Sequence, residues 1–375
     1  MKDIQHQSKD SSLASGATHR HDVMVLGGGP AGATSALLLA RQGLDVVLLE
    51  RSQGEDFKVG ESLPPMAAPL VERLGLLGVL NSGEHLRCYG NQSSWGSSGL
   101  QDTDFLYSPP GYGWHLDRTA FEEALLGLVA EAGGKVLRGF RAQRILPNDP
   151  GYEALGDNQR RAARFLIDAT GMARFFLRRQ QTLGPHDDRL VATMAFFGAS
   201  PQTQDEDSRT LIEARSDGWW YTAQVPGRRR VVIQFTDAED VGPRTENDFV
   251  QHRLRRTQHV APRLFDHGYE LVHGPHRKIV ESLFPGRVAG SDWLAVGDAA
   301  LSVDPLSSQG IWNALRTAEW SAAALARHLA GDPSALSDYQ SQVEQTYKDY
   351  LAQRAEFYRR EQRWTAQPFW QHRQL

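Results

Sequence analysis

A glycine-rich turn near the N-terminus constrains the fold of this chain more than any other sequence feature. Residues 23–26 are a short apolar run, and Gly27-Gly28-Gly29-Pro30-Ala31-Gly32 follows at once. The turn has glycine at the first, third and sixth positions of the pattern G-x-G-x-x-G. A helix is predicted over residues 33–42 and a second buried strand over residues 45–49, which ends at Glu50. A strand, a glycine turn, a helix and a strand in this order predict a dinucleotide-binding unit.

Each position of this unit has a physical role in the prediction. The first glycine permits the tight turn, the third lets the backbone approach a pyrophosphate, and the sixth permits close packing of the helix. The helix N-terminus stabilises the negative charge of the phosphates. Glu50 lies 18 residues beyond Gly32, which suits a carboxylate that accepts a ribose hydroxyl. The predicted binding residues here are Gly27, Gly29, Pro30, Ala31, Gly32, Glu50 and Arg51.

Two more apolar strands further along the chain end in an acid and a glycine. Residues 293–296 lead into Gly297-Asp298, and residues 165–167 lead into Asp168-Ala-Thr-Gly171. After the first of them comes a turn from Pro305 to Gly310, and then a long helix predicted over residues 311–329. A plain nicotinamide dehydrogenase has no use for the Gly297-Asp298 element, so a second cofactor contact is expected there.

In order and spacing, these three elements resemble the flavoprotein monooxygenases of the aromatic-hydroxylase type, over about residues 22–330. The resemblance implies that the glycine turn binds the ADP part of FAD and that the second acid contacts the ribityl chain. It also implies that the turn before the long helix presents amides to the flavin, where the helix N-terminus would stabilise the reduced ring. The residues so implied are Asp168, Gly297, Asp298, Pro305, Gln309 and Gly310.

Further segments narrow the resemblance to one branch of this superfamily. They are Gly60-Glu61-Ser62, residues 95–98, residues 113–118, residues 218–222 and the aromatic segment 358–370. Together they resemble the branch that holds tryptophan halogenases and geranylgeranyl reductases. Within it the chain is most similar to short halogenase-like flavoproteins that mature protein-derived tryptophylquinone cofactors. This implies that Glu61, Ser62 and Arg118 lie beside the flavin.

The chain departs from the halogenase pattern at two places. Flavin halogenases carry a lysine in the strand after their Gly-Glu-Ala-Thr segment, but the matching residues 87–95 contain none, and the whole chain has six. Lys58 precedes this region and is interpreted as a solvated surface group. Residues 219–223 also lack the halogenase pattern Trp-x-Trp-x-Ile-Pro. Halogenation is therefore the second reading, and reduction of isoprenoid double bonds by a flavoprotein is a third.

The expected activity is hydroxylation of an electron-rich aromatic ring. The resemblance implies that reduced FAD reacts with O2 to a C4a-hydroperoxide, with NAD(P)H or a flavin reductase as the electron source. The aromatic substrate is expected to be a tryptophan in a peptide or protein. His115 is a candidate general base, with a structural strand position as the alternative. Four aromatic residues are candidates for the pocket wall, with core packing as the alternative: Trp95, Trp219, Trp220 and Tyr221.

The fold class expected is α/β. An FAD-binding, three-layer Rossmann-like domain would carry an inserted, mostly antiparallel β-sheet substrate domain and a C-terminal helix. The FAD domain is expected at 21–85, 112–178 and 275–330, the substrate domain at 86–111 and 179–274, and a helical segment at 331–375. Substrate-domain strands are predicted at 191–197, 210–214, 219–224 and 230–236, and helices at 118–132, 246–256 and 333–363.

Composition excludes several other classes. The formal net charge of -4 over 375 residues gives no footprint for nucleic acid. The single Cys88 excludes an internal disulfide and a multi-cysteine metal site, and no metal is predicted. No apolar run reaches the roughly 18 residues that span a bilayer, so no membrane association is expected. Residues 1–20 are polar without an apolar segment, which predicts a flexible leader on a cytoplasmic enzyme.

Overall fold

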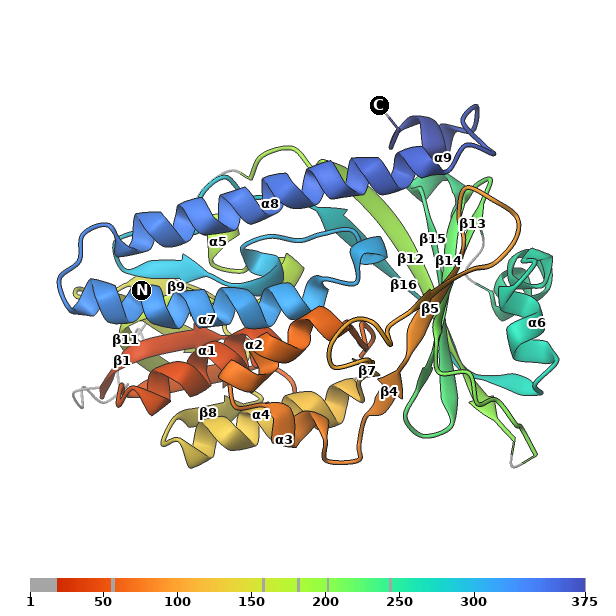
Figure 1. The fold of residues 1–375 in the computed structure, drawn as a ribbon. Coiled ribbons are helices and arrows are strands. Elements are labelled where there is room, and N and C mark those ends of the chain that lie inside the picture. Colours follow the sequence, from red (N-terminus) through yellow and green to blue (C-terminus); the bar gives the residue numbers. More distant parts are fainter. Residues whose placement is uncertain are drawn as a thin grey trace, which may run out of the picture.

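The computed structural model describes residues 19–54, 58–156, 159–180, 183–200, 202–242 and 245–374. Residues 1–18, which are most of the leader predicted over residues 1–20, lie outside the described residues. Strand β1 (Arg20–Leu26) begins at the last residue of the predicted leader. The chain forms two large sheets and one small sheet (Figure 1). Helices α1, α4 and α7 accompany one large sheet, and the other stands beside them (Figure 1).

The first large sheet, called the nucleotide sheet below, has the strand order β8-β2-β1-β11-β10-β9, and β17 pairs with β11. Strands β8, β2, β1, β11 and β17 run parallel, whereas β9 and β10 are antiparallel additions. Parallel strands are covered on both faces, which explains the continuous apolar runs in β1 and β2. The other strands are β2 (Val46–Glu50), β8 (Lys135–Arg138), β9 (Arg144–Pro147), β10 (Tyr152–Gly156), β11 (Gln159–Asp168) and β17 (Trp293–Ala295).

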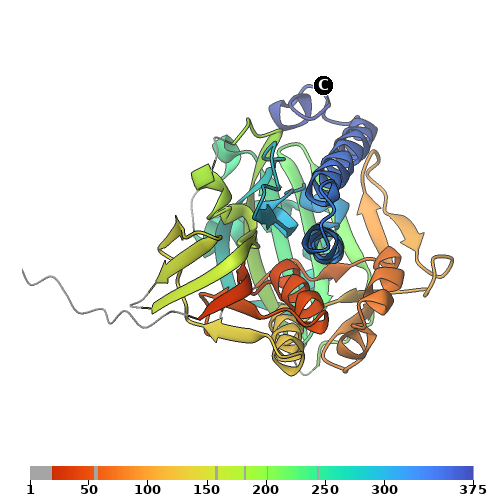
Figure 2. The same ribbon diagram turned by 90° about the vertical axis from the view of Figure 1, so that its left-hand side faces the viewer.

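Helix α1 (Pro30–Arg41) follows β1 directly and packs between α4 (Arg118–Glu131) and α7 (Gly310–Leu329). The close approach of α1 to α7 is marked by a hydrogen bond of 3.1 Å between the hydroxyls of Ser35 and Ser321. Helix α8 (Ala335–Arg360) runs along α7, and Figure 2 shows the pair beside each other in end-on view. The predicted C-terminal helix is therefore present and continues toward the second large sheet (Figure 1).

The second large sheet, called the substrate sheet below, has the order β16-β12-β15-β14-β13-β5-β6. Its pairings are antiparallel except for β13 with β5. All four strands predicted here are present. The bounds are β5 (Gly90–Ser94), β6 (Gln101–Asp104), β12 (Asp188–Ala199), β13 (Thr210–Arg215), β14 (Gly218–Val225), β15 (Arg229–Thr236) and β16 (Tyr269–Ser282).

Strand β16 corrects one expected domain boundary. We placed the change of domain between residues 274 and 275, but β16 runs through this point as one strand. It pairs with β12 from Ala199↔Tyr269 to Asp188↔Ser282. The Gly274-Pro275 dipeptide, a turn signal in sequence, lies where the register shifts, so it marks a β-bulge and not the end of an element.

The helix predicted over residues 246–256 is also different in detail. The structure has a π-helix at Asp248–Arg253 and a 3-10 turn at Leu254–Arg256. Phe249 and Val250 in the π-helix and Leu254 in the 3-10 turn are the buried residues of this segment. The remaining short elements are β3 (Ser62–Leu63), β4 (Leu86–Cys88), β7 (Gly113–His115), α2 (Ala68–Arg73), α3 (Leu77–Leu80), α5 (Leu177–Gln180), α6 (Val260–Phe265) and α9 (Pro368–Gln371), with 3-10 turns at Pro65–Ala67, Gly171–Ala173, Ala238–Asp240, Gly297–Ala299 and Pro305–Ser307.

The two faces of the substrate sheet pack against different partners. One face carries Trp219 and Phe235 and packs with the aromatic C-terminal segment around Trp370. The other face carries Trp220 and packs with the π-helix and α6, around Leu264. The expected α/β class, with an inserted mostly antiparallel sheet and a C-terminal helix, is confirmed. Within the described part of the chain, no helix has the length and apolarity needed to cross a membrane.

Candidate functional site

A cavity of about 1060 Å³ lies between the nucleotide sheet and the substrate sheet. It opens at the carboxyl ends of the parallel strands, where ligands bind in open α/β sheets. The structure gathers on its surface most of the residues proposed from sequence to contact a cofactor. They are Gly27, Gly29, Pro30, Ala31, Glu50, Arg51, Glu61, Ser62, Arg118, Gly297, Asp298, Pro305 and Gly310.

In the glycine turn, two glycines are required because a side chain would collide with the protein backbone, and a third borders open space. A Cβ on Gly27, where φ is +101°, would lie 2.5 Å from the carbonyl oxygen of Ala169. A Cβ on Gly32 would lie 2.0 Å from the carbonyl oxygen of Gly27. A Cβ on Gly29 would meet nothing within 4 Å. Gly29 therefore borders open space at the N-terminus of α1, the place where a pyrophosphate would lie.

Glu50, at the end of β2, is held by backbone amides on both carboxylate oxygens. Oε2 accepts from the amide of Gly28 at 2.5 Å, and Oε1 accepts from the amide of Ser52 at 2.7 Å. The carboxylate lines the cavity beside the glycine turn. This arrangement fixes the acid at the position where the sequence motif expects the ribose hydroxyls of a dinucleotide.

The second glycine-acid element lies across the cavity at the end of β17. Gly297 adopts a φ of +59°, and its amide donates to the Thr317 hydroxyl of α7 at 2.9 Å. Asp298 lines the cavity and is only partly exposed. Burial raises the pKa of its carboxyl, against the opposing charges of Lys278, Arg174 and Arg118. The N-terminus of the 20-residue helix α7 begins at Gly310 on the same wall.

These donors and acceptors fit an FAD molecule. The turn offers backbone amides and free space for a pyrophosphate, Glu50 offers a carboxylate for the ribose, and Asp298 offers a second carboxylate for the ribityl chain. The start of α7 offers the positive end of a helix dipole to the flavin. Each group was placed by a different segment of the chain, yet all line one cavity.

Three predicted cofactor residues lie behind the cavity surface. Gly32 packs against the turn, as described above. Asp168 is fully buried and accepts hydrogen bonds from the amides of Thr170, Phe176 and Leu177 at 3.0–3.1 Å, so it shapes the turn after β11. Gln309 is directed toward α8, where its side chain donates to that of Gln353 at 3.4 Å. Asp168 therefore holds the turn in shape from behind the cavity, whereas a contact from the backbone of the turn that contains Gln309 stays a prediction.

The loop before β3 is fixed by Arg118 and carries a residue that the sequence analysis misjudged. Arg118 donates to the carbonyl oxygens of Val59 and Gly60, each at 2.9 Å, and pairs with Glu122. Lys58 was interpreted as a solvated surface group. It lines the cavity instead and forms an ion pair with the buried Glu122. The correction follows from the turn of the loop toward α4, which local sequence does not report.

Glu61, Ser62 and Tyr221 form a buried hydrogen-bonded group on the cavity surface. The Tyr221 hydroxyl donates to Glu61 Oε1 and lies 2.8 Å from the Ser62 hydroxyl, and the amide of Gly60 donates to Glu61 Oε2 at 3.0 Å. Burial raises the pKa of the Glu61 carboxyl, and burial with the neighbouring acid raises that of Tyr221. This group joins the cofactor loop to the substrate sheet and can hold a proton within the cavity wall.

The aromatic run on β14 divides between the two faces of the sheet. Successive side chains on a strand point to opposite faces. Trp219 and Tyr221 line the cavity, whereas Trp220 is absent from its wall and packs against Phe249, with 5.5 Å between the ring centroids. Trp219 is stacked on Phe235 at 4.0 Å and donates from Nε1 to the Tyr358 hydroxyl at 3.2 Å.

Three aromatic or basic candidates are therefore corrected. Trp220 faces the wrong side of the sheet. Trp95 donates to the carbonyl oxygen of Phe357 at 2.8 Å and packs against Trp370, so it anchors the C-terminal segment. His115 is fully buried outside the cavity wall, with Nε2 3.0 Å from the Thr210 hydroxyl. Burial, with the nearby charge of Arg230, lowers its pKa to about 3, which suits a neutral structural imidazole and not a general base.

The sequence analysis missed the part of the wall that comes from β12, β15 and β16. These strands contribute mainly apolar side chains, and β16 also contributes basic ones: Ala192, Met194, Ile233, Phe235, His276, Arg277, Lys278 and Val280. The alternation along β12 and β15 was visible in sequence, but which face would meet the cofactor was not. A further missed feature is the buried Asp304, which accepts from the Tyr358 hydroxyl at 2.7 Å and so ties the turn before α7 to α8.

Comparison with protein families gives two matches. Residues 92–375 match the family described as tryptophan halogenase, and residues 20–62 match an FAD binding domain. The FAD binding domain match covers the glycine turn, Glu50 and the loop before β3, and the tryptophan halogenase match covers the other residues of the cavity wall. The tryptophan halogenase match thus includes parts of both cavity walls, because it spans β11, β17 and α7 as well as β12–β16.

Among curated proteins, the chain is 32% identical over 373 residues to a protein of Marinomonas mediterranea named "Putative FAD-dependent oxidoreductase LodB". That match covers 94% of this chain and 96% of LodB. The tryptophan 2-halogenase of Chondromyces crocatus is 26% identical, over 83% of this chain and 62% of that longer protein.

Two solved structures have similar folds. The peptidyl tryptophan dihydroxylase QhpG, described as essential for tryptophylquinone cofactor biogenesis, superimposes with a TM-score of 0.76 and 25% identity, over 95% of this chain and 79% of QhpG. The myxobacterial chondrochloren halogenase CndH superimposes with a TM-score of 0.82 and 23% identity, over 95% of this chain and 86% of CndH. The CndH match shows a shared fold.

Proposed function

Because this chain belongs to the tryptophan halogenase family of flavin-dependent enzymes, we propose that it is an FAD-dependent monooxygenase that hydroxylates an electron-rich aromatic ring. The observation that carries the proposal is one continuous cavity. Its cofactor wall holds Asp298 and the start of α7, and its substrate wall holds Trp219, Tyr221 and Phe235. An aromatic wall of this kind suits an indole or phenol placed against the flavin.

When bound, FAD would supply the chemistry of oxygen activation, and the chain would position the ring and exclude water. Trp219 is held rigidly by its stacking on Phe235 and its bond to Tyr358, so it offers a fixed surface for a substrate ring. Glu61 and Tyr221 would hold a proton beside the flavin, because both groups are buried and their pKa values are raised. O2 is the co-substrate in this proposal, and NAD(P)H or a separate flavin reductase supplies the electrons.

The proposed substrate is a tryptophan residue of a peptide or protein, and the proposed role is maturation of a quinone cofactor. Likeness to the peptidyl tryptophan dihydroxylase QhpG over 95% of this chain supports this choice. The absence of lysine from residues 87–95, where halogenases carry one, also favours oxygen transfer over halogenation.

Halogenation is the second candidate, and two lysines favour it. Lys58 and Lys278 both line the cavity, although from segments other than the one expected. Lys58 is paired with Glu122, whereas Lys278 has no ion pair with any residue that the structure describes. The similarity to the tryptophan 2-halogenase of C. crocatus points the same way. The two functions differ in the atom that is added to the ring, so product analysis separates them.

The test uses the full chain loaded with FAD, an NADH-dependent flavin reductase and O2. Three substrates are offered in parallel, namely free tryptophan, a tryptophan-containing peptide and the same peptide with phenylalanine in place of tryptophan, each with chloride and bromide present. We expect a mass gain of one or two oxygen atoms on the tryptophan peptide alone. A product in which halogen replaces hydrogen would overturn hydroxylation in favour of the second candidate. An isoprenoid quinone is offered in a separate reaction, and saturation of one of its side-chain double bonds by two hydrogens would favour the third reading, a reductase.

A further inference from the structure

A group of metal-ligating side chains lies at the end of the nucleotide sheet opposite the cavity. His19 directly precedes β1, His21 is the second residue of β1, and Asp45 directly precedes β2. Alternate residues along an extended strand point to the same face. Strand β2 pairs with β1 in the register Val23↔Val46, which brings Asp45 alongside. The chain therefore presents a His-x-His pair and a carboxylate from a neighbouring strand to one point.

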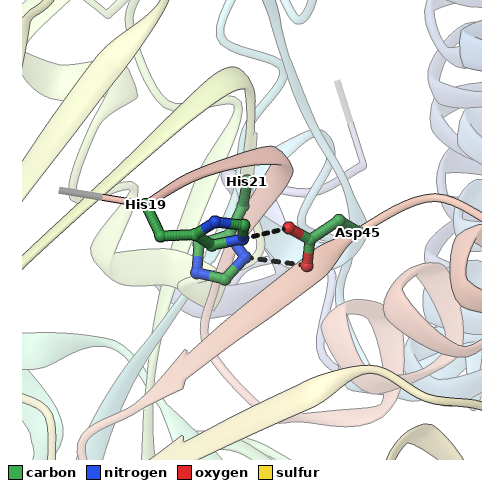
Figure 3. A group of neighbouring side chains, drawn as sticks. All are labelled: His19, His21 and Asp45. Atoms are coloured by element: carbon green, nitrogen blue, oxygen red, sulfur yellow. Dashed lines mark hydrogen bonds and ion pairs between the residues drawn. The ribbon is translucent and has the colours of Figure 1, made fainter. Parts of the chain in front are cut away.

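The three side chains already face one another (Figure 3). His19 Nε2 lies 2.6 Å from Asp45 Oδ2, and His21 Nδ1 lies 2.9 Å from Asp45 Oδ1. The centroids of the two imidazole rings are 4.7 Å apart and the rings are nearly perpendicular. Each of the three residues offers one ligand atom, and these three atoms lie within 4.8 Å of one another. Each ring directs one nitrogen at the Asp45 carboxylate (Figure 3).

We propose that His19, His21 and Asp45 form a binding site for a divalent transition metal, of which Zn²⁺ fits the ligands best. Besides cysteine sulfur, Zn²⁺ binds imidazole nitrogen and carboxylate oxygen, with metal–ligand distances of roughly 2.0–2.2 Å. Three protein ligands leave a fourth tetrahedral position for water. Metal binding would replace the two hydrogen bonds to Asp45, and each imidazole would then carry its proton on the ring nitrogen that does not bind the metal.

The burial of the three residues suits such a site. His21 is 4% exposed and is fixed by the strand, whereas the side chains of His19 and Asp45 are 73% and 43% exposed. Ligand atoms of a tetrahedral metal lie about 3.4 Å apart, so the contacts to Asp45 must open by about 0.5–0.8 Å, and the two exposed side chains have room to make this shift. The fixed one gives the site its position, and the open side gives the metal an entry path.

The site would act on stability and not on catalysis. It joins the residues before β1 to the turn before β2, at the amino ends of these strands, while the glycine turn lies at the carboxyl end of β1. A strand of seven residues separates the two ends by about 20 Å. The inference is thus independent of the proposed function, and either can fail without the other.

The test uses the full chain without an affinity tag, purified with chelator and then dialysed free of it. Titration with ZnCl₂ in a calorimeter should show saturable binding of one ion per chain, and Co²⁺ should give a visible spectrum typical of tetrahedral coordination. Saturating Zn²⁺ should raise Tm by a few degrees, because a ligand that binds only the folded state stabilises it. Chelator should reverse this shift.

Three variants and one matched control make the test decisive. His19→Ala removes an exposed ligand without touching the core, and it should weaken Zn²⁺ binding at least tenfold. Asp45→Asn and His21→Ala should do the same, whereas His252→Ala, a histidine on another surface, should bind as the parent does. Absence of saturable binding in the parent would overturn the site. The site would also be overturned if His19→Ala bound Zn²⁺ as tightly as the parent does. This outcome can be read even if His21→Ala fails to fold.

Discussion

The two walls of the cavity are built in contrasting ways. The cofactor wall comes from short contiguous segments, above all the six residues from Gly27 to Gly32 and the pair Gly297-Asp298. The substrate wall comes from single side chains scattered over β12, β14, β15 and β16. On the cofactor wall, the proposed function depends on backbone amides and on glycines that have no Cβ. On the substrate wall it depends on which face of a strand each side chain occupies.

This difference predicts that the two walls respond differently to substitution. A glycine at the turn is required by backbone conformation and close approach, which local sequence sets. An aromatic residue on β14 is required by register, which the pairing of β14 with β13 and β15 sets. The following predictions test this contrast, from the largest effect to the smallest.

The largest effect is expected in the glycine turn. Two substitutions there distinguish a glycine that the fold requires from a glycine that only FAD binding requires. Gly32→Ala places a Cβ 2.0 Å from the Gly27 carbonyl oxygen, so the turn itself must shift. We expect this variant to lose bound FAD and to unfold at a clearly lower temperature. Gly29→Ala meets no protein atom within 4 Å, so it should keep the Tm of the FAD-free protein and lose only FAD affinity. FAD content by absorbance and Tm by calorimetry measure both. Equal loss of Tm in the two variants would contradict the assignment.

The next largest effect concerns His115, which lies in the interior and belongs to neither wall. Its pKa is lowered to about 3 in the folded protein, below its ordinary value. The neutral imidazole therefore contributes stability that is complete above about pH 6.5 and is lost as the pH falls toward 3, at roughly 1.4 kcal/mol per unit. His115→Gln should flatten the pH dependence of the unfolding free energy in urea between pH 7 and 5. An unchanged slope would show that His115 is already charged or solvated.

His115→Gln also serves as the activity control. If the residue is structural, kcat on the aromatic substrate at pH 7.5 should change little once FAD content is matched. A loss of kcat of a hundredfold or more at full FAD content would restore it as a catalytic base.

A smaller effect is expected from the paired tryptophans of β14, which have equal burial and opposite faces. Trp220→Phe should lower the unfolding free energy by about 1–2 kcal/mol and leave kcat/KM nearly unchanged, because Trp220 packs against Phe249 on the outer face. Trp219→Phe should lose a comparable amount of stability and also lower kcat/KM for the aromatic substrate about tenfold. If both substitutions lower kcat/KM alike, the two faces of the sheet are not functionally distinct.

The smallest effect is expected at Glu61, where the two walls meet. Burial raises the pKa of this carboxyl, so folding favours the protonated form. Its stabilising contribution is complete at pH values below its ordinary value and is lost as the pH rises through the raised value. In Glu61→Gln the side-chain carbonyl can accept from the Gly60 amide, and the side-chain amide can donate to the Tyr221 oxygen once the Tyr221 hydroxyl hydrogen turns to the Ser62 hydroxyl.

We therefore expect the Glu61→Gln variant to show a flatter Tm between pH 5 and 8 than the parent, with a gain of a few degrees at the upper end. Glu123→Gln is the matched control of opposite sign. The hydrogen bond from Arg138 lowers the pKa of Glu123, so its contribution is present above its ordinary value and is lost as the pH falls. If the Tm of the parent does not fall below that of Glu61→Gln as the pH rises to 8, Glu61 ionises in the folded protein without loss of stability.

The sequence by itself determined the fold class, the strand–turn–helix unit and nearly all of the cofactor wall. These features depend on local chemistry, namely glycines where a Cβ would collide, an acid at a strand end and a helix that starts at the phosphates. They are recognisable because each motif is contiguous and its physical requirement is met within a few residues. Gly27, Glu50 and Asp298 were therefore placed correctly relative to the cavity.

Only the tertiary structure decided which side chains form the opposite wall. Trp219 and Trp220 are neighbours in sequence with the same chemistry, and strand register alone turns one inward and the other outward. The turn of its loop brought Lys58 to the cavity, and pairing with β12 carried β16 across an expected domain boundary. The meeting of His19 and His21 with Asp45 likewise depends on the pairing of β1 with β2. Non-local pairing sets all of these positions, and no short segment of sequence contains that information.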